Sequence, residues 1–156
     1  MLEIINYTQQ KIKEMKIRAL VSLFLKTYKK SDYLITLVLS GDQKIKTFNR
    51  RYRRQDKVTD VLSIRQEEYM GNILGEIIIN LSASGRLKDY QELLRELKLD
   101  KLAKKNQADF IFYFLLVHGL LHLIGYNDDS PVERQGMITL GKNFMKKLAK
   151  YGIIRL

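Results

Sequence analysis

Two histidines placed four residues apart in an apolar segment constrain this chain more than any other feature. His118 and His122 are the only two histidines in 156 residues, and they lie near the end of the apolar run 110–124, just before Gly125. Apolar residues at helical density followed by a glycine predict a buried helix that ends near Gly125. Because residues i and i+4 share one face of a helix, we expect both imidazoles to point the same way.

The residues after this helix complete the pattern. Gly125 can adopt the left-handed conformation that reverses the chain at a helix end, so the polar turn 127–129 can fold back toward the rings. Two histidines and one carboxylate leave an open coordination position, which is typical of catalytic metal sites. A lone histidine is more simply a core residue, but this pair beside an acidic turn favours a metal. Asp128 and Asp129 are both candidates for the third ligand.

The charge of the chain gives the next constraint. Its 28 Lys and Arg against 17 Asp and Glu give a net charge of +11, which favours a polyanionic partner, most simply nucleic acid. A solvated basic surface without a partner is the alternative. Within 48–57, basic residues alternate with aromatic ones, as suits phosphate contact and base stacking. We expect the substrate-binding residues here to be Arg50, Arg51, Arg54 and Lys57.

Composition and length narrow the class of protein. The chain has no cysteine, which excludes disulfides and thiolate zinc sites. The N-terminal segment does not read as a signal peptide, and no apolar run approaches the ~20 residues of a membrane span. We therefore expect a cytoplasmic protein that folds as one domain over residues 1–156.

Hydrophobic periodicity predicts helices and strands in alternation. Strands are expected at 2–6, 33–39, 59–64 and 73–79, and helices at 11–28, 43–53, 82–98, 110–124 and from 131 onward. The two strands within 59–79 can form a hairpin, so a mixed sheet of about four strands is favoured over a parallel one. The expected fold is α/β (mixed α+β), with the metal-bearing helix at its centre.

Capping residues predict two helix starts. Ser130, Pro131 and Glu133 have the spacing of a capping box with proline at the first helical position, so Glu133 is expected to cap rather than catalyse. Asn106 is expected to cap the metal-bearing helix, with Asp109 in its first turn.

Three motifs together resemble those of the YbeY family of metal-dependent endoribonucleases, which act in ribosomal RNA maturation. The first is His118-Gly-x-Leu-His122-Leu-x-Gly125-Tyr126. The second is Phe48-Asn49-x-x-Tyr52-Arg53-x-x-Asp56-x-x-Thr59-Asp60-Val61-Leu62-Ser63, and the third is Leu74-Gly75-Glu76-Ile77. The three stand in the order in which the family has them.

The resemblance implies a zincin-like fold and a set of site residues. His118 and His122 match the first two metal ligands of the family, and Asp128 stands where the family has a third histidine. One Zn²⁺ per chain is implied, and another divalent transition metal suits the same ligands. Arg53 matches the functionally important arginine, whose guanidinium can bind the charge that develops on a phosphate. Pairing with Asp56 is the alternative role of Arg53.

The implied activity is a metal-dependent, single-strand-specific endoribonuclease. It would act on the 3′ end of 16S ribosomal RNA in maturation and ribosome quality control. Ribosomal RNA and small-subunit ribosomal proteins are the implied partners, and neither DNA nor a membrane is expected. A zinc ion with three protein ligands lowers the pKa of a bound water, which is the chemistry such a hydrolase needs.

Two other functions fit parts of the pattern. A metalloprotease shares the histidine spacing but needs a Glu after the first histidine, where this chain has Gly119. Close packing of the helix on the sheet accounts for a glycine there. A non-catalytic, metal-stabilised RNA-binding factor in ribosome assembly fits the charge and the metal site equally well. Whether the metal changes RNA cleavage, or only RNA affinity and folding, separates this factor from the nuclease.

Overall fold

Four strands form one mixed sheet. The computed structural model describes residues 1–66 and 71–155. The strands β1 (Leu2–Asn6), β2 (Leu34–Ser40), β3 (Val61–Arg65) and β4 (Ile73–Asn80) lie in the order β1-β2-β4-β3. Both β1 and β4 run parallel to β2, whereas β3 pairs with β4 in the antiparallel sense as an edge strand. The mixed α/β fold and the hairpin are therefore confirmed.

Alternate residues of the central strands belong to two separate hydrophobic cores. Leu37 and Leu39 of β2 contribute to the larger core, whereas Val38 between them contributes to the smaller one. Successive side chains of a strand point to opposite faces, so each core lies on one face of the sheet. This division decides which helices share a face with the metal-bearing helix.

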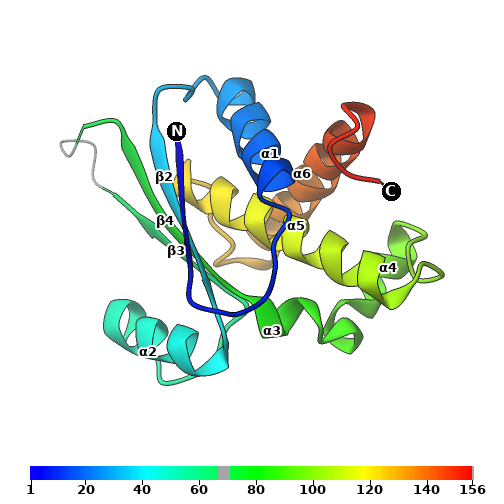
Figure 1. Cartoon of the computed structure of the whole chain (residues 1–156), viewed down its shortest axis with the longest axis horizontal. Coiled ribbons are helices and arrows are strands. Elements are labelled where there is room, and N and C mark those ends of the chain that lie inside the picture. The colour runs from blue at the N-terminus through cyan, green and yellow to red at the C-terminus, as the bar shows by residue number, and fades with distance from the viewer. Residues whose placement is uncertain (67–70, 156) are drawn as a thin grey trace.

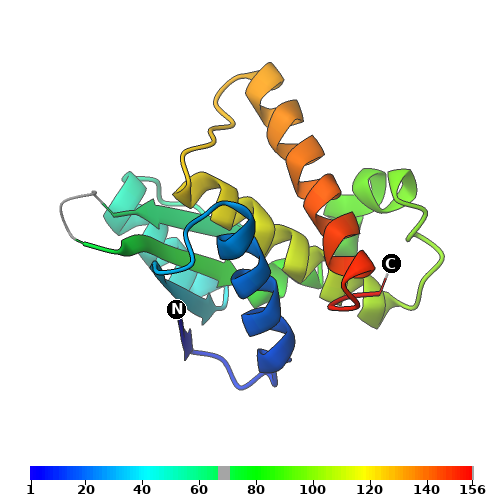
Figure 2. The ribbon, with the colours of Figure 1, turned by 90° about the horizontal axis from the view of Figure 1, so that it is seen from above.

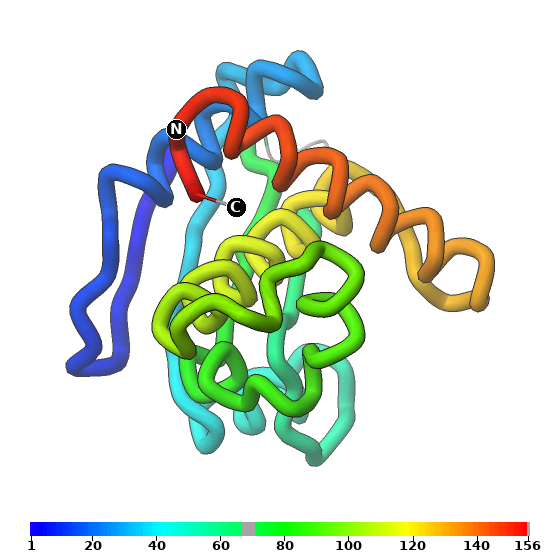
Figure 3. Tube along the Cα trace, turned by 90° about the vertical axis from the view of Figure 1, so that its right-hand side faces the viewer, coloured from blue at the N-terminus to red at the C-terminus, as the bar shows by residue number. Residues whose placement is uncertain are grey.

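Three helices cover the face with the larger core (Figures 1 and 2). They are α1 (Glu14–Thr27), α5 (Lys104–Leu123) and α6 (Pro131–Lys150). Figure 3 shows α6 passing along one side of α5. A Cβ on Gly141 of α6 would lie 2.9 Å from the ring of Phe114, so these two helices approach closely. The apolar surface all around α5 therefore reflects its burial between the sheet and its neighbours.

The helix α2 (Asp42–Arg53) packs on the opposite face of the sheet. Its Ile45 is fully buried with Leu62 in the smaller core. Asn49 is also buried, and its amide donates a 2.9 Å hydrogen bond to the carbonyl of Lys57. Ile45 and Asn49, one helical turn apart, therefore attach a strongly basic helix to the sheet.

The predicted helix 82–98 is wrong, because three short pieces take its place. They are α3 (Leu81–Ser84), the 3-10 helix η2 (Leu87–Tyr90) and α4 (Gln91–Glu96). α3 ends just before Arg86, whose side chain bonds to carboxylates on other elements. These partners are distant in sequence, so local periodicity could not show the break.

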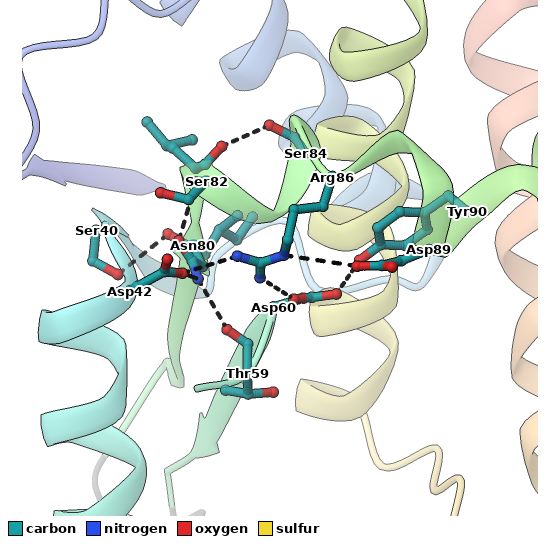
Figure 4. A network of polar contacts seen from close by, with 12 residues as sticks. Ser40, Asp42, Thr59, Asp60, Asn80, Ser82, Ser84, Arg86, Asp89 and Tyr90 are labelled. Carbon is teal, nitrogen blue, oxygen red and sulfur yellow. Dashed lines mark hydrogen bonds and ion pairs between the residues drawn. The ribbon is translucent and has the colours of Figure 1, made fainter. Parts of the chain in front are cut away.

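Arg86 is the centre of a polar network at one end of the sheet (Figure 4). Its guanidinium donates to Asp42 at 3.0 Å and to Asp60 at 2.8 Å. The Asn80 amide donates to Asp42 at 2.5 Å, and the hydroxyl of Tyr90 donates to Asp60. The network therefore joins α2, the chain entering β3, the end of β4 and η2. The strand β3 begins at Val61, two residues later than predicted.

The predicted capping box of α6 is confirmed. The side chain of Ser130 accepts from the N–H of Glu133, and the Glu133 carboxylate accepts from the N–H of Ser130 at 2.9 Å. Pro131 is the first helical residue.

The predicted start of α5 is wrong. The helix begins at Lys104 after Ala103, so Asn106 lies inside it, and Asp109 pairs with Lys13 instead of occupying the first turn. Gln107 is buried and donates to two carbonyls of the preceding turn, at 2.9 and 2.8 Å. This side-chain contact holds the preceding turn against the helix and accounts for the earlier start.

Within the described residues, each helix is too short or insufficiently apolar to cross a membrane.

Candidate metal centre

The two histidines lie on the last turns of α5 with their rings together. The Nε2 atoms of His118 and His122 are 3.1 Å apart, and the ring planes are perpendicular. Each side chain is 18% exposed, so both rings are largely shielded but reachable from solvent. The i, i+4 spacing has therefore placed two nitrogen atoms on one face, as the sequence predicted.

The turn after α5 brings the third group to the histidines. Gly125 has φ +104° and donates its N–H to the carbonyl of His122, while Tyr126 N–H donates to Leu121. This pair of bonds is a Schellman motif, which reverses the chain after a left-handed residue. As a result, Asp128 Oδ2 lies 3.5 Å from Nε2 of His118 and 3.7 Å from Nε2 of the other histidine.

These three side chains fit one metal ion. Among the described residues, His118, His122 and Asp128 form a group whose ligand atoms all lie within 4.8 Å of one another. Ligand atoms bound at about 2.0–2.1 Å to one tetrahedral zinc lie about 3.3 Å apart. The observed separations of 3.1, 3.5 and 3.7 Å are close to that value. Of the two aspartates left open by the sequence, Asp128 belongs to the group and Asp129 does not.

A backbone carbonyl orients one of the two rings. Nδ1 of His122 lies 3.0 Å from the carbonyl oxygen of Tyr126. Because a carbonyl can only accept, Nδ1 carries the proton of this contact, which leaves Nε2 as the nitrogen suited to bind a metal. Metal-binding histidines are held in this way by a partner on the other nitrogen. The Schellman motif therefore places both Asp128 and the group that orients His122.

Burial favours the neutral form of His118. Loss of solvent lowers the pKa of this imidazole, the neighbouring His122 lowers it further, and Asp128 partly opposes both effects. Metals bind the neutral form of imidazole. The environment of His118 therefore keeps the ring in its ligand form over a wider range of acidic pH.

The edge strand β3 supports the helix α5 that carries the two histidines. The hydroxyl of Ser63 donates a 3.2 Å hydrogen bond to the carbonyl of Gly119. A Cβ on Gly119 would lie 2.7 Å from a methyl of Ile77 and 3.1 Å from the Ser63 hydroxyl. The expected close packing at Gly119 is therefore confirmed. The position where a metalloprotease has its Glu faces the sheet, and a larger side chain would collide with it.

The predicted arginine and basic residues lie on α2 and the loop after it. Arg53 is in the last turn of α2, is exposed, and within the described part of the chain has no hydrogen bond or ion pair. Asp56 pairs with Lys46 at 3.5 Å, so it is not the partner of Arg53. The other basic residues of the cluster are also exposed, and they are Arg50, Arg51, Arg54 and Lys57.

Because α2 packs on the opposite face of the sheet from α5, the structure separates this basic cluster from the three metal-group side chains. It brings together the three predicted ligands, but it leaves Arg53 on a different element and face.

Two residues near the metal group escaped the sequence analysis as contributors to the site. Tyr126 contributes its carbonyl to His122. The Nη1 atom of Arg65 lies 3.2 Å from the position that a Cβ on Gly125 would occupy. Arg65 follows Ser63 by two residues on β3 and so shares its face. The alternation of side chains along β3 could have predicted that Arg65 and Ser63 share a face. Which helix they face could only be known from the fold.

Comparison with known proteins agrees with this architecture. Residues 3–149 match the family model described as Endoribonuclease YbeY. A solution structure of TM1509 from Thermotoga maritima has a TM-score of 0.51 at 21% identity and covers 98% of this chain and 95% of that one. At this identity the likeness shows the fold alone.

Proteins named Endoribonuclease YbeY also match in sequence. The one from Anaeromyxobacter sp. is 30% identical over 78% of this chain, and the match spans 58% of that relative. The one from Heliobacterium modesticaldum is 33% identical over 76% of this chain and 72% of the relative. The one from Aquifex aeolicus is 28% identical over 94% and 91%. With the family model matching nearly the whole chain, these relatives show that the chain belongs to the YbeY endoribonuclease family.

Proposed function

We propose that this chain is a metal-dependent endoribonuclease that hydrolyses phosphodiester bonds in single-stranded RNA. The observation that carries the proposal is the group of His118, His122 and Asp128 at the end of α5, in a member of the YbeY family. The net charge of +11 supports a polyanionic substrate. We further propose that residues 1–156 act as one domain.

The finer proposal concerns the substrate. The RNA is ribosomal, the cut lies at the 3′ end of 16S ribosomal RNA, and the role is maturation and quality control of ribosomes in the cytoplasm. Small-subunit ribosomal proteins are the proposed protein partners. This part rests on the family alone.

The three side chains would hold one Zn²⁺. Two imidazoles and a carboxylate are ligands that zinc accepts, and the same set suits iron, nickel or manganese. When bound, such an ion lowers the pKa of water and polarises phosphoryl oxygens. The chain itself lowers the pKa of His118 by burial, which favours the neutral form, and orients His122 through the carbonyl of Tyr126.

The basic residues of α2 and its following loop would bind the RNA backbone. Arg53 is exposed and has no described partner, so its guanidinium is available to make two parallel hydrogen bonds to a phosphate. Arg50, Arg51, Arg54 and Lys57 would contact further phosphates. Because this cluster and α5 lie on opposite faces, an RNA strand that reaches both must pass around an edge or an end of the sheet.

The decisive experiment measures cleavage of a single-stranded ribosomal RNA fragment by chelator-stripped protein, with and without added zinc. We expect zinc to restore cutting in the wild type and not in His118→Ala. If no metal restores cutting while the fragment still binds, the nuclease proposal fails. A metal-stabilised assembly factor would then be the better description.

Arg53 can be tested against its neighbour on the same helix. We expect Arg53→Ala to lower kcat by about 100-fold, as loss of a donor to transition-state charge does. Arg51→Ala, which removes the same charge two residues earlier on α2, is expected to raise KM and leave kcat near the wild-type value. Equal effects of both variants on KM alone would assign Arg53 to general RNA binding.

A further inference from the structure

A small hollow lies beside the turn that carries the metal group. It has a volume of about 260 Å³ and is lined by Tyr28, Lys30, Ile124, Gly125 and Tyr126. Two of these residues, Gly125 and Tyr126, stand between the ligands His122 and Asp128 in the chain. Sites for drug-sized ligands have volumes of about 300–1,000 Å³. This hollow is smaller, so it has room for one ring system rather than a larger ligand. A ligand bound there would therefore be a neighbour of the metal.

Two helix ends of the same kind form this hollow. At the end of α1, the N–H of Lys30 donates to Leu25 and that of Lys29 donates to Lys26, with Lys29 at φ +55°. This Schellman motif matches the one that follows α5. The first motif fixes Tyr28 and Lys30, and the second fixes Tyr126. The walls of the hollow are thus set by hydrogen-bonded backbone.

Both the aromatic and the cationic walls are held in place. The ring of Tyr28 packs on the buried ring of Phe24, with centroids 4.5 Å apart. Burial and the neighbouring Tyr126 raise the pKa of Tyr28, so its hydroxyl stays protonated at neutral pH. The ammonium of Lys30 lies 4.4 Å from the centroid of Tyr33 and donates to its hydroxyl. Tyr126 remains 40% exposed and can be reached by a ligand.

The chemistry of these walls matches one nucleotide of a single strand. Aromatic side chains stack on bases without regard to sequence, and cations beside them bind the backbone. The residues that line the hollow include two tyrosines and one lysine, and no acidic residue. The guanidinium of Arg65 also lies beside Gly125, near enough that a Cβ on the glycine would contact it. The turn therefore has both the aromatic hollow and an arginine next to it.

We propose that this hollow binds an unstacked nucleobase of single-stranded RNA next to the cleaved bond, and that Arg65 contacts the adjoining phosphate. The inference rests on the proposed nuclease function and adds a base-binding subsite to it. It assigns Tyr126 two roles: the backbone carbonyl orients His122, and the side chain stacks on the base. Only an unpaired base can enter such a hollow, so this subsite also supplies a selection for single strands.

Binding of a short single-stranded oligoribonucleotide to metal-free protein tests the subsite without relying on cleavage. We expect Tyr126→Leu to weaken binding by about tenfold, the scale of one lost base–aromatic stack. The variant keeps the carbonyl that holds His122, and its thermal unfolding should match the wild type. Tyr151→Leu is the matched control, because Tyr151 is 63% exposed and lies beyond the end of α6. An oligonucleotide with abasic positions should bind Tyr126→Leu and wild type equally.

Arg65 has a separate signature in the salt dependence of binding. We expect Arg65→Gln to reduce the slope of log K against log salt by about 0.7, the value for one phosphate contact on a single strand. Tyr126→Leu should leave that slope unchanged. Arg95→Gln on α4 is the control for loss of one positive charge.

Failure of the subsite and failure of the nuclease give different results. If Tyr126→Leu binds and cleaves as the wild type does, the subsite is wrong while the nuclease stands. If no metal gives cleavage but binding still depends on Tyr126 and on the base, the subsite stands without the nuclease. If the loss of affinity is the same for normal and abasic RNA, the hollow does not bind a base. The aromatic surface would then fit a protein partner better.

Discussion

Asp128 and Asp129 are adjacent in the chain, yet only one of them faces the histidines. Asp128 Oδ2 lies 3.5 and 3.7 Å from the two Nε2 atoms because the Gly125 turn reverses the chain. Loss of a group that hydrogen-bonds to a metal ligand weakens metal affinity by about 10–100-fold. We expect Asp128→Ala to weaken zinc affinity by more than this, because it removes a proposed ligand itself. Asp129→Ala should have little effect. Competition with a chromophoric chelator measures both, and equal losses would contradict the assignment.

Gly119 and Gly136 both lie inside helices but have opposite surroundings. A Cβ on Gly119 meets Ile77 at 2.7 Å, whereas a Cβ on Gly136 meets nothing within 4 Å. We expect Gly119→Ala to lower the free energy of unfolding by about 1–3 kcal/mol through overpacking. Gly136→Ala should raise it by about 0.5–1 kcal/mol, because alanine is the better helix residue. Urea unfolding of both variants would show whether the signs differ.

At the scale of elements, four helices end in the same way with different residues. The left-handed position after the helix is Lys29 for α1, Lys98 for α4, Gly125 for α5 and Gly152 for α6. A residue with a Cβ is disfavoured there. The helix that carries His118 and His122 has a glycine at this position, so its turn forms without that cost.

This comparison predicts opposite effects at two helix ends. Lys29→Gly should raise the free energy of unfolding by up to about 1 kcal/mol, since glycine adopts the left-handed conformation without a steric cost. Gly152→Ala should lower it by about 1–2 kcal/mol for the converse reason. Neither position lines the metal group, so zinc affinity should not change. Thermal unfolding of both variants measures the two changes in stability. Changes of the same sign in Lys29→Gly and Gly152→Ala would contradict the prediction.

At the scale of the whole molecule, the network around Arg86 couples elements that the sequence keeps far apart. Hydrogen bonds from Asn80 and then from Arg86 lower the pKa of Asp42 below its usual value. A carboxyl whose pKa is lower in the folded state binds fewer protons than in the unfolded chain as pH falls. Its stabilising effect is present above the unfolded pKa and is lost as pH falls through the folded pKa.

We therefore expect Asp42→Asn to reduce the loss of stability between neutral pH and about pH 3. Urea unfolding at several pH values, beside Asp32→Asn as a charge-matched control outside the network, measures the difference. A pH dependence that is the same in Asp42→Asn and wild type would show that the network does not contribute to acid sensitivity.

Local patterns were sufficient for much of the chain. The strand at 2–6 has the predicted bounds, the capping box at Ser130 formed, and the two histidines share a face. Each of these depends on residues within a few positions of one another. The helix predicted over 82–98 failed because Arg86 bonds to Asp42 and Asp60, which are far from it in sequence. The cap predicted at Asn106 failed because the helix begins earlier, at Lys104.

The strand at 2–6, the buried helix with the two histidines and the reversal at Gly125 have local causes, so sequence patterns were sufficient to predict them. The packing of distant segments selects the aspartate that meets the histidines and sets Gly119 against Ile77. It also decided that Arg53 and the histidines belong to opposite faces of the sheet, and that Tyr28 and Arg65 approach the same turn. The physical reason is that a side chain's direction follows from local backbone geometry, whereas its neighbours depend on how distant segments pack to bury their apolar faces.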